Sequence, residues 1–334
     1  MRRVDRRSEL QRWIEIELNA SPLVLEPASA DASFRRYFRV RTAAQSLIAM
    51  DAPPAHEDCR PFVHVARLMA EAGLNVPRVI AQDLERGFVL LSDLGTAGYL
   101  QALNGDTVDA LFDDAIDALL RWQQASKPGV LPDYDHALLA RELKLFPEWY
   151  VRRHRGFTLS SGQTESLEAM FALILKNNLA QPAVYVHRDY MPRNLMVCVP
   201  NPGVLDFQDA VYGPITYDVA SLFKDAFVSW DEERVLDWTA RYWDKAKRAG
   251  LPVAADFGDF YRDFEWMGLQ RHLKVLGIFA RLNYRDGKSA YLEDTPRFVG
   301  YVRAVAARYG AFKPLLMLLD EIEGKAPASV GYTF

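Results

Sequence analysis

This sequence has few cysteines, a small net charge and no long apolar run. Its two cysteines, Cys59 and Cys198, lie far apart and in no C-x-x-C pattern, so we expect free thiols of a reducing compartment. The net charge of −4 mixes both signs and leaves no basic footprint for nucleic acid. No apolar run is long enough to span a bilayer, and the Arg-rich residues 2–7 precede a charged amphipathic segment where a signal peptide has an apolar core. We therefore predict a cytoplasmic protein that binds neither nucleic acid nor membrane.

The stretch 187–194 carries the strongest chemical signal. It reads His-Arg-Asp-Tyr-Met-Pro-Arg-Asn and lies between two apolar runs, 183–186 and 195–199. The turn signal Asn-Pro-Gly at 201–203 and a short apolar step then lead to Asp206, so the spacing predicts a hairpin that returns a second carboxylate to the same end. Two carboxylates and an amide are the groups that Mg²⁺-assisted phosphoryl transfer requires.

This stretch matches the H-R-D-x-x-x-x-N catalytic loop of kinases, and Asp-Phe-Gln at 206–208 stands where protein kinases have D-F-G. We expect Asp189 to orient the attacking hydroxyl and accept its proton, and Asn194 and Asp206 to hold Mg²⁺. The alternative interpretation is a surface hairpin whose Asp and Asn serve turns. Two motifs at this spacing, with strand patterns around both, favour the catalytic interpretation.

Three more polar residues are predicted to support the loop. We expect His187 to be buried beneath it and to act neither as acid nor as base. Asp218 opens a predicted helix and should accept backbone N–H bonds from the loop, while Asp209 is expected to bond within its own loop, with support of a second ion as the alternative. Only the eleven residues 207–217 separate Asp206 from Asp218, which leaves no room for the activation segment of a protein kinase. A small molecule is therefore the predicted phosphoryl acceptor.

Strand patterns dominate the first part of the chain and helical patterns the rest. Candidate strands lie at 23–25, 37–40, 45–51, 79–81 and 88–91, and helices at 8–20 and 57–73. Beyond residue 95, helices are predicted at 107–124, 136–150, 164–179, 229–250, 257–282 and 296–319. The predicted fold is α+β and bilobal, like that of protein kinases. Its small lobe, 1–94, has mostly antiparallel strands and one main helix, and its larger lobe, 95–334, is mainly helical and binds the substrate.

The small lobe is predicted to bind nucleotide. The hinge at 92–95 contains three residues whose backbone is suited to hydrogen-bond an adenine edge: Ser92, Asp93 and Leu94. Position 50, in the predicted third strand, is Met50 where kinases carry a phosphate-binding lysine. A Glu partner for that lysine is absent as well, since Phe62 occupies its expected place, so the ion pair is predicted to be replaced as a unit.

The turn between the first two strands lacks glycine. A kinase covers the ATP phosphates at this place with a Gly-rich loop, but no glycine lies between Asp31 and Val40. Phosphate contacts would come from the backbone near Ser33 and Phe34 and from the side chain of Arg35 or Arg36. A solvated basic hairpin is the alternative interpretation.

The motifs together resemble the aminoglycoside phosphotransferase family. The resemblance rests on His-Arg-Asp at 187–189 with Asn194, on Gly-Val-Leu-Asp-Phe-Gln-Asp-Ala at 203–210, and on Tyr-Asp-Val-Ala-Ser-Leu at 217–222. It covers about residues 25–310 and implies a protein-kinase fold and phosphorylation of a small molecule. The small lobe departs from the family pattern at residues 31–40 and at Met50.

Three further stretches are similar to a narrower group of that family: Met-Asp-Ala-Pro-Pro at 50–54, Asp-Cys-Arg-Pro-Phe at 58–62, and residues 268–277. This group comprises bacterial anomeric sugar kinases that phosphorylate N-acetylmuramate and N-acetylglucosamine at C1 in peptidoglycan recycling. The resemblance implies ATP and Mg²⁺ as cofactors and an amino sugar as substrate. It also implies that the product passes to a uridylyltransferase.

The lactyl carboxylate of N-acetylmuramate requires a cation. Arg271, His272 and Lys274 lie on one predicted helix in a run too polar for pure core, with a solvated helix face as an equal alternative. Tyr190 and Arg193 in the catalytic loop are alternative substrate contacts.

Two other functions stay open. A kinase of another small hydroxyl acceptor, such as an aminoglycoside, choline or an amino-acid type, would keep every catalytic residue. A pseudokinase that binds nucleotide as a regulator is favoured by Met50 and by the absent glycines. The intact Asp189, Asn194 and Asp206 favour an enzyme.

Overall fold

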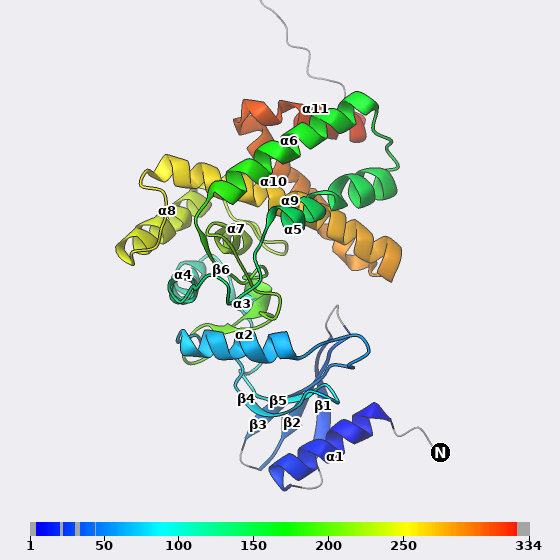
Figure 1. Ribbon diagram of the computed structural model, residues 1–334, viewed down its shortest axis with the longest axis vertical. Coiled ribbons are helices and arrows are strands. Elements are labelled where there is room, and N and C mark those ends of the chain that lie inside the picture. Colours follow the sequence, from blue (N-terminus) through cyan, green and yellow to red (C-terminus); the bar gives the residue numbers. More distant parts are fainter. Residues whose placement is uncertain (1–4, 21–22, 31–33, 44, 326–334) are drawn as a thin grey trace, which may run out of the picture. The chain divides into compact units, whose positions relative to one another are not determined.

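The computed structural model describes residues 5–20, 23–30, 34–43 and 45–325. The chain forms two compact units (Figure 1): unit 1 comprises Met1–Ala125 with Pro192–Ala210, and unit 2 comprises Ser126–Met191 with Val211–Phe334. The chain therefore passes from unit 2 into unit 1 inside the predicted catalytic loop, between Met191 and Pro192. The functional division into lobes with a hinge at 92–95 stays a prediction.

Unit 1 is built on a five-stranded antiparallel sheet with the order β1-β2-β3-β5-β4. Its strands are β1 (Val24–Ala30), β2 (Arg36–Arg41), β3 (Ser46–Asp51), β4 (Val79–Asp83) and β5 (Phe88–Ser92). The central β3 and β5 are almost wholly buried, as expected for strands covered on both faces. The predicted strands of the small lobe are thus confirmed.

Helix α1 (Arg6–Leu18) covers one face of this sheet. Its buried Leu10, Trp13 and Ile14 pack into one apolar cluster with residues of the sheet. The rings of Trp13 and Phe88 lie 5.7 Å apart, and Nε of Arg6 is 2.6 Å from Oδ1 of the fully buried Asp51. Helix α1 is therefore attached to the sheet by both apolar and ionic contacts.

Helix α2 (Arg60–Glu71) lies on the opposite side of the sheet from α1 (Figure 1). Its buried face comprises Phe62, Val65, Ala66 and Met69, the apolar stripe that the sequence predicts. The chain leaves the helix through Gly73, whose φ of +80° favours glycine.

The rest of unit 1 consists of helices α3 (Tyr99–Ala102) and α4 (Val108–Gln124) and the segment 192–210. In that segment a 3₁₀ turn, Pro192–Asn194, leads into the predicted hairpin of β7 (Leu195–Met196) and β8 (Gly203–Val204). A Cβ at Gly203 would lie 2.8 Å from Sγ of Cys198 and 2.9 Å from Cδ1 of Leu94, so a larger residue there would force these side chains to move. The hairpin is thus packed tightly against the chain near residue 94.

Unit 2 is mainly helical. Its strands β6 (Ala183–Val186) and β9 (Val211–Pro214) form one antiparallel pair. Its helices are α5 (His136–Leu143), the π-helix η1 (Phe146–His154), α6 (Ser161–Ala180), α7 (Tyr217–Phe223), α8 (Glu232–Arg248), α9 (Phe257–Asp286), the 3₁₀ helix η3 (Ser289–Asp294), α10 (Thr295–Arg308), the 3₁₀ turn η4 (Gly310–Phe312) and α11 (Lys313–Ile322). The long α9 carries sixteen buried residues and forms the centre of the apolar core.

Two predicted helices are wrong in their extent. The helix predicted at 136–150 ends at Leu143, and the π-helix η1 follows it with Pro147 in its first turn. The helix predicted at 296–319 is divided into α10 and α11 around Gly310, with Pro314 in the first turn of α11. Proline cannot donate the helical N–H bond, so each of these prolines favours a new helix start over continuation.

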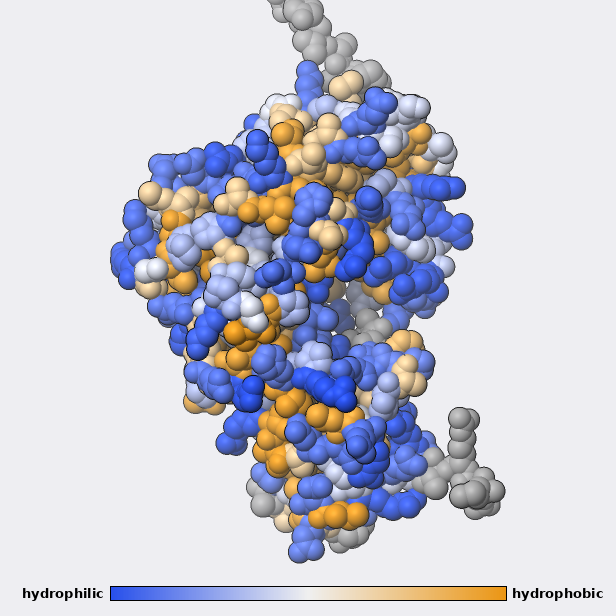
Figure 2. Space-filling model, in the orientation of Figure 1, coloured by the Kyte–Doolittle hydropathy of each residue, from blue (hydrophilic) through white to orange (hydrophobic). Residues whose placement is uncertain are grey.

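The surface is mixed, with hydrophilic residues over most of the visible face and apolar side chains in separate patches (Figure 2). Within the described ranges, no helix is long and apolar enough to cross a membrane. Both cysteines are free thiols, as predicted. The α+β, protein-kinase-like fold predicted from the sequence is confirmed by this antiparallel sheet and helical second unit.

Candidate active site

The first part of the predicted catalytic loop, 187–191, follows β6 in unit 2. Asp218, at the start of α7, accepts the amide N–H of His187 at 2.6 Å on Oδ2 and that of Arg188 at 3.0 Å on Oδ1. These are the amide contacts predicted for Asp218. The ring of His187 is fully buried, and its Nδ1 accepts the amide N–H of Asp189 at 3.2 Å. Asp218 and His187 therefore fix the backbone that carries Asp189.

Burial raises the pKa of Asp218 to about 7, although the two amide hydrogen bonds act in the opposite direction. The charge of Asp189 also raises it, and the charge of Arg271 lowers it. Asp218 is fully buried, while Asp189 is partly exposed. This difference suits Asp218 for a positioning role and Asp189 for contact with a substrate.

Arg188 holds the loop to the interior of unit 2. Its φ of +75° is unusual for a residue with a side chain. Nη2 of Arg188 is 2.6 Å from Oε1 of Glu142 in α5, and Nζ of Lys274 in α9 is 3.0 Å from the same oxygen. Tyr134 donates its hydroxyl to the other oxygen of Glu142, and Lys274 also donates to the hydroxyl of Tyr217 at 3.0 Å.

The charges in this group shift one another's pKa values. Burial disfavours the charged form of Glu142, but Lys274 and Arg188 outweigh it and lower the pKa of Glu142. Burial likewise acts against the charge of Lys274, but Tyr217, Glu142 and Asp189 together raise its pKa. Asp189, the predicted catalytic residue, therefore lies within electrostatic range of a largely buried group of two cations and one carboxylate: Arg188, Lys274 and Glu142.

The two predicted metal ligands lie together in unit 1. Nδ2 of Asn194 is 3.4 Å from Oδ2 of Asp206, and Nε2 of Gln208 donates to Oδ1 of Asp206 at 2.9 Å. Asp206 has a φ of +62°. Among the described residues, the only other non-glycine residues with positive φ are Asn19 and Arg188. Residues in this sparsely populated region cluster at functional sites, and both predicted loops contain one.

The donor set fits Mg²⁺ but not a metal held by protein alone. In the described part of the chain, no group of three or more His, Cys, Asp or Glu residues is placed to hold an ion. Mg²⁺ takes hard oxygen ligands and completes its shell with water and substrate phosphates, so one carboxylate and one amide oxygen suffice. The Asp206 side chain is 39% exposed and thus accessible to such an ion. Asp209 is exposed in the turn that follows.

Arg35 brings a cation to this site. Its Nη2 lies 3.9 Å from Oδ1 of Asp206, and its side chain is only 11% exposed. In β3 the lysine position is Met50, which is fully buried between Tyr37 of β2 and Val89 of β5.

In kinases an ion pair connects β3 to the helix at the place of α2. Here α2 contacts the loop that carries Asp206 through an aromatic pair instead. Ring centroids of Phe62 and Phe207 are 4.9 Å apart. Phe207 directly follows Asp206, so this apolar contact can position the loop of the predicted metal ligand. The lysine and glutamate that form the ion pair in kinases are absent here.

The predicted hinge is well bonded. Asp93 accepts one hydrogen bond from Nε of Arg39 at 2.7 Å and another from the hydroxyl of Ser46 at 2.5 Å. Burial works against ionisation of Asp93, but these bonds and that from the amide of Gly95 outweigh it and lower its pKa. Oγ of Ser92 accepts the amide of Arg78 at 2.8 Å. The side chains of Ser92 and Asp93 thus bond within unit 1, and the nucleotide contact predicted for the backbone here stays a prediction.

The turn before β2 is described only from Phe34. Ser33, a predicted phosphate contact, lies outside the described residues. Phe34 is 62% exposed, stacks on His56 at 4.5 Å, and donates its amide to Glu57 at 3.2 Å. The backbone amide of Phe34 therefore donates to the Glu57 carboxylate in this structure.

The predicted substrate contacts differ in their surroundings. Tyr190 is buried against His187 at 5.6 Å, whereas Arg193 is exposed in the 3₁₀ turn of unit 1. The solvated-face alternative for the α9 residues is wrong, because all three are buried: Arg271 at 3%, His272 at 0% and Lys274 at 8% exposure.

Of these α9 residues, two are engaged inside unit 2. Lys274 is bonded to Glu142 and Tyr217. Burial, and then the charges of Lys224 and Arg271, hold the pKa of His272 well below its usual value, so His272 is neutral.

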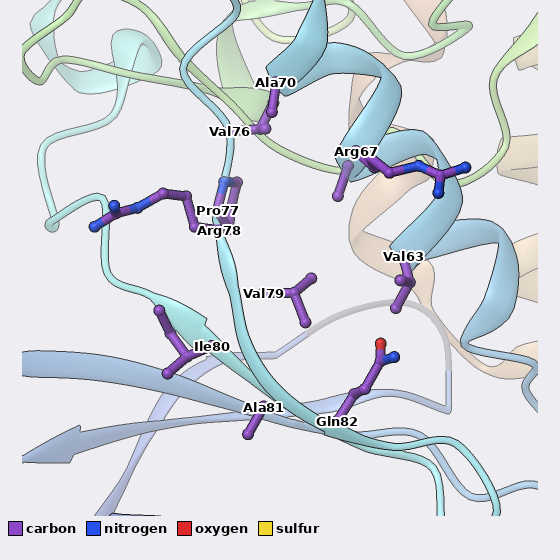
Figure 3. A pocket seen from close by; sticks show the side chains of 11 residues that line it. Val63, Arg67, Ala70, Val76, Pro77, Arg78, Val79, Ile80, Ala81 and Gln82 are labelled. Atoms are coloured by element: carbon purple, nitrogen blue, oxygen red, sulfur yellow. The ribbon is translucent and has the colours of Figure 1, made fainter.

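A separate cavity of about 480 Å³ lies between α2 and β4 in unit 1 (Figure 3). It is lined by Val63, Ala66, Arg67 and Ala70 of α2 and by residues 76–82. None of the predicted site residues lines it, and we assign it no role.

Comparisons with known proteins establish the family of the chain. Residues 24–257 match the phosphotransferase enzyme family. The chain belongs to this family. It is 55% identical over 304 residues to an N-acetylmuramate/N-acetylglucosamine kinase from Pseudomonas putida, covering 91% of this chain and 90% of that one. It is 47% identical over 336 residues to a kinase of the same name from Neisseria meningitidis, covering 99% and 100%.

The fold likeness extends further than the sequence likeness. A choline kinase from Streptococcus pneumoniae superposes with a TM-score of 0.62 at 12% identity, covering 89% of this chain and 99% of that one. Its likeness shows a shared fold alone. The family membership predicted from the motifs is confirmed by the match of residues 24–257 to the family.

Two positions that the sequence analysis missed hold the predicted site together. Glu142, in the helix predicted at 136–150, and Arg39, in the strand predicted at 37–40, are not among the predicted site residues. Their ion pairs join residues 46 and 54 positions apart, with Arg188 and Asp93 respectively. No periodicity within one helix or strand signals a contact of this range.

Proposed function

We propose that this protein is an ATP-dependent kinase that phosphorylates the anomeric (C1) hydroxyl of N-acetylmuramate and N-acetylglucosamine in peptidoglycan recycling. The observation that carries the proposal is the 47–55% identity, over at least nine-tenths of the chain, to kinases named for these two sugars. The motif residues Asp189, Asn194 and Asp206 are all present to support an active enzyme.

Asp189 is the proposed catalytic residue. Its carboxylate orients the C1 hydroxyl of the sugar and accepts its proton as the bond from that oxygen to the γ-phosphorus forms, while the bond from the γ-phosphorus to the bridging oxygen breaks and ADP leaves. An anomeric hydroxyl is more acidic than other sugar hydroxyls, so an ordinary carboxylate is basic enough. The contacts that His187 and Asp218 make with the loop backbone support this role because they fix the backbone that carries the carboxylate.

Unit 1 contains the proposed ATP-binding residues. Asn194 and Asp206 would hold Mg²⁺, which when bound neutralises charge on the ATP phosphates. Arg35 is the proposed replacement for the lysine absent at Met50, because its guanidinium lies 3.9 Å from a metal-ligating carboxylate. The backbone of 92–95 would contact adenine, and Phe34 would border the phosphates.

The product defines the next reaction. A sugar 1-phosphate is the substrate that a uridylyltransferase converts to a UDP-sugar, so we propose transfer of the product to such an enzyme. ATP and UTP are both cytoplasmic metabolites, and the two free thiols agree with a reducing compartment. We therefore propose a cytoplasmic location.

A second candidate is a kinase for choline or an aminoglycoside, since the chain shares its fold with a choline kinase. To separate the candidates, purified protein with Mg²⁺-ATP is assayed for ADP release with both amino sugars, choline and a panel of aminoglycosides. We expect ADP release with the two amino sugars alone, and its loss in Asp189→Asn. Turnover of choline or an antibiotic without turnover of either sugar would favour the second candidate. ATP binding without turnover of any acceptor would identify a pseudokinase.

A further inference from the structure

Unit 2 contains two buried residues of opposite charge, Asp225 and the predicted lactyl contact Arg271. Arg271 of α9 is 3% exposed, and Asp225, just after α7, is 1% exposed. Among the described residues, Nη1 of Arg271 and Oδ1 of Asp225 have no hydrogen-bond partner. Native proteins retain few such atoms, and a bound ligand, ion or water commonly accounts for them. An unpaired donor and an unpaired acceptor thus occur in the interior of the same unit, where the charge of Arg271 acts on Asp225.

Arg271 connects this pair to the predicted catalytic loop. Its Nη2 contacts Sδ of Met191 at 3.9 Å, and Met191 lies two residues after Asp189. Burial raises the pKa of Asp218 and of Asp225, and the charge of Arg271 lowers both. The guanidinium therefore lies beside the loop that carries the proposed catalytic aspartate.

Polar groups extend from the buried pair to the surface. Exposed Ser229, in the segment 224–231 between α7 and α8, accepts Nη1 of Arg297 at 3.1 Å and shares a hydrogen bond with the hydroxyl of Tyr301 at 2.9 Å. Burial raises the pKa of Tyr301, on which the charges of Arg297, Asp225 and Arg271 also act. Tyr301 also stacks on His272, the neighbour of Arg271 in α9, at 4.8 Å, so the exposed Ser229 and its two partners lie beside the part of α9 that carries Arg271.

We propose that Asp225 and Arg271 form the acceptor-binding subsite, which rests on the proposed function as an amino-sugar kinase. Nη1 of Arg271 donates to an oxygen of the sugar's acyl or carboxylate group, and Oδ1 of Asp225 accepts from a hydroxyl or amide N–H. An N-acetylated sugar offers groups of both kinds. A carboxylate makes the stronger, charge-assisted bond, so Arg271 sets the preference for N-acetylmuramate, while Asp225 acts on both sugars.

The test compares two substrates within each variant. The ratio of kcat/KM for N-acetylmuramate to that for N-acetylglucosamine does not depend on the fraction of folded protein. Arg271→Gln should lower this ratio about tenfold or more, because it removes one hydrogen bond between charged groups. Asp225→Asn should raise KM for both sugars by about tenfold and leave the ratio within about twofold of wild type.

Arg303→Gln is the matched control, because Arg303 is a half-buried, ion-paired arginine of α10 whose partners are Asp320 and Glu323. Its ratio should equal that of wild type. A wild-type ratio in both Arg271→Gln and Arg271→Lys would mean that only water satisfies the pair, and would overturn the assignment. Wild-type KM values in Asp225→Asn would overturn it for Asp225. Wild-type protein that phosphorylates neither sugar overturns the proposed function itself, a result distinct from an unchanged ratio.

Discussion

Replacement of Glu142 by glutamine tests how the catalytic loop is held. In the folded protein one carboxylate, 7% exposed, faces both Arg188 at 2.6 Å and Lys274 at 3.0 Å. Glu142→Gln preserves the shape of the side chain but leaves two buried cations without their counter-ion. Removing one partner of a buried ion pair costs about 3–5 kcal/mol, a large part of the about 5–15 kcal/mol that stabilises a typical protein.

The same change should reduce turnover. In wild type, the two cations Arg188 and Lys274 balance Glu142 and Asp189. Without Glu142, both cations act on Asp189 alone and draw its carboxylate away from the orientation that the sugar hydroxyl needs. We expect kcat to fall at least about tenfold, since displacement of a catalytic group costs rate steeply.

The assay is urea unfolding at pH 7 together with steady-state kinetics. Glu142→Gln should unfold at a clearly lower midpoint, and the further change Lys274→Met should recover part of the loss because it removes one unbalanced cation. The pKa of Glu142 lies below its usual value of 4.5, so its contribution is present at neutral pH and lost as the pH falls below about 4.5. The difference in stability between Glu142→Gln and wild type should therefore shrink in acid.

The control is Asp237→Asn, in an exposed pair with Arg241, which should change stability by less than about 1 kcal/mol. Equal midpoints for wild type and Glu142→Gln at pH 7 would refute the reasoning.

Three further outcomes follow from unit 1. Asp206→Asn should raise the Mg²⁺ concentration for half-maximal activity at least about tenfold, since it removes a charged ligand, and an unchanged Mg²⁺ titration would count against that role. Arg35→Gln should raise KM for ATP about tenfold with KM for the sugar unchanged, whereas Arg41→Gln, an exposed arginine of β2, should match wild type in both. Asp51→Asn should lower the free energy of unfolding by about 3 kcal/mol, because the buried carboxylate pairs with Arg6 and Arg36, and an unchanged melting temperature would contradict this.

Local patterns in the sequence predicted the elements of the fold well. The alternation in 37–40 and 45–51 and the apolar stripe of α2 each follow from a repeat within one segment, and the structure confirms them. The helices predicted at 136–150 and 296–319 failed because internal prolines, Pro147 and Pro314, begin new helical segments there.

The supporting contacts of the site required the folded chain. The catalytic motif alone marks Asp189, Asn194 and Asp206, because a motif fixes residue types at short spacing. It does not indicate that Glu142 lies under Arg188. The polarity of Lys274 did not show that it is internal. Its ammonium is buried because it pairs with Glu142, which is distant in the sequence. Long-range pairing of charges is decided by packing, which leaves no trace in local periodicity.

The central claim is transfer of phosphate to C1 of an N-acetylated amino sugar, and NMR of the product tests it most directly. Purified protein is incubated with Mg²⁺-ATP and N-acetylglucosamine, and in parallel with N-acetylmuramate, with Asp189→Asn as the control. The account predicts a non-reducing, acid-labile product whose phosphorus couples to H1, and no product from Asp189→Asn. A stable phosphate on C6, or a product that is still a reducing sugar, would contradict it.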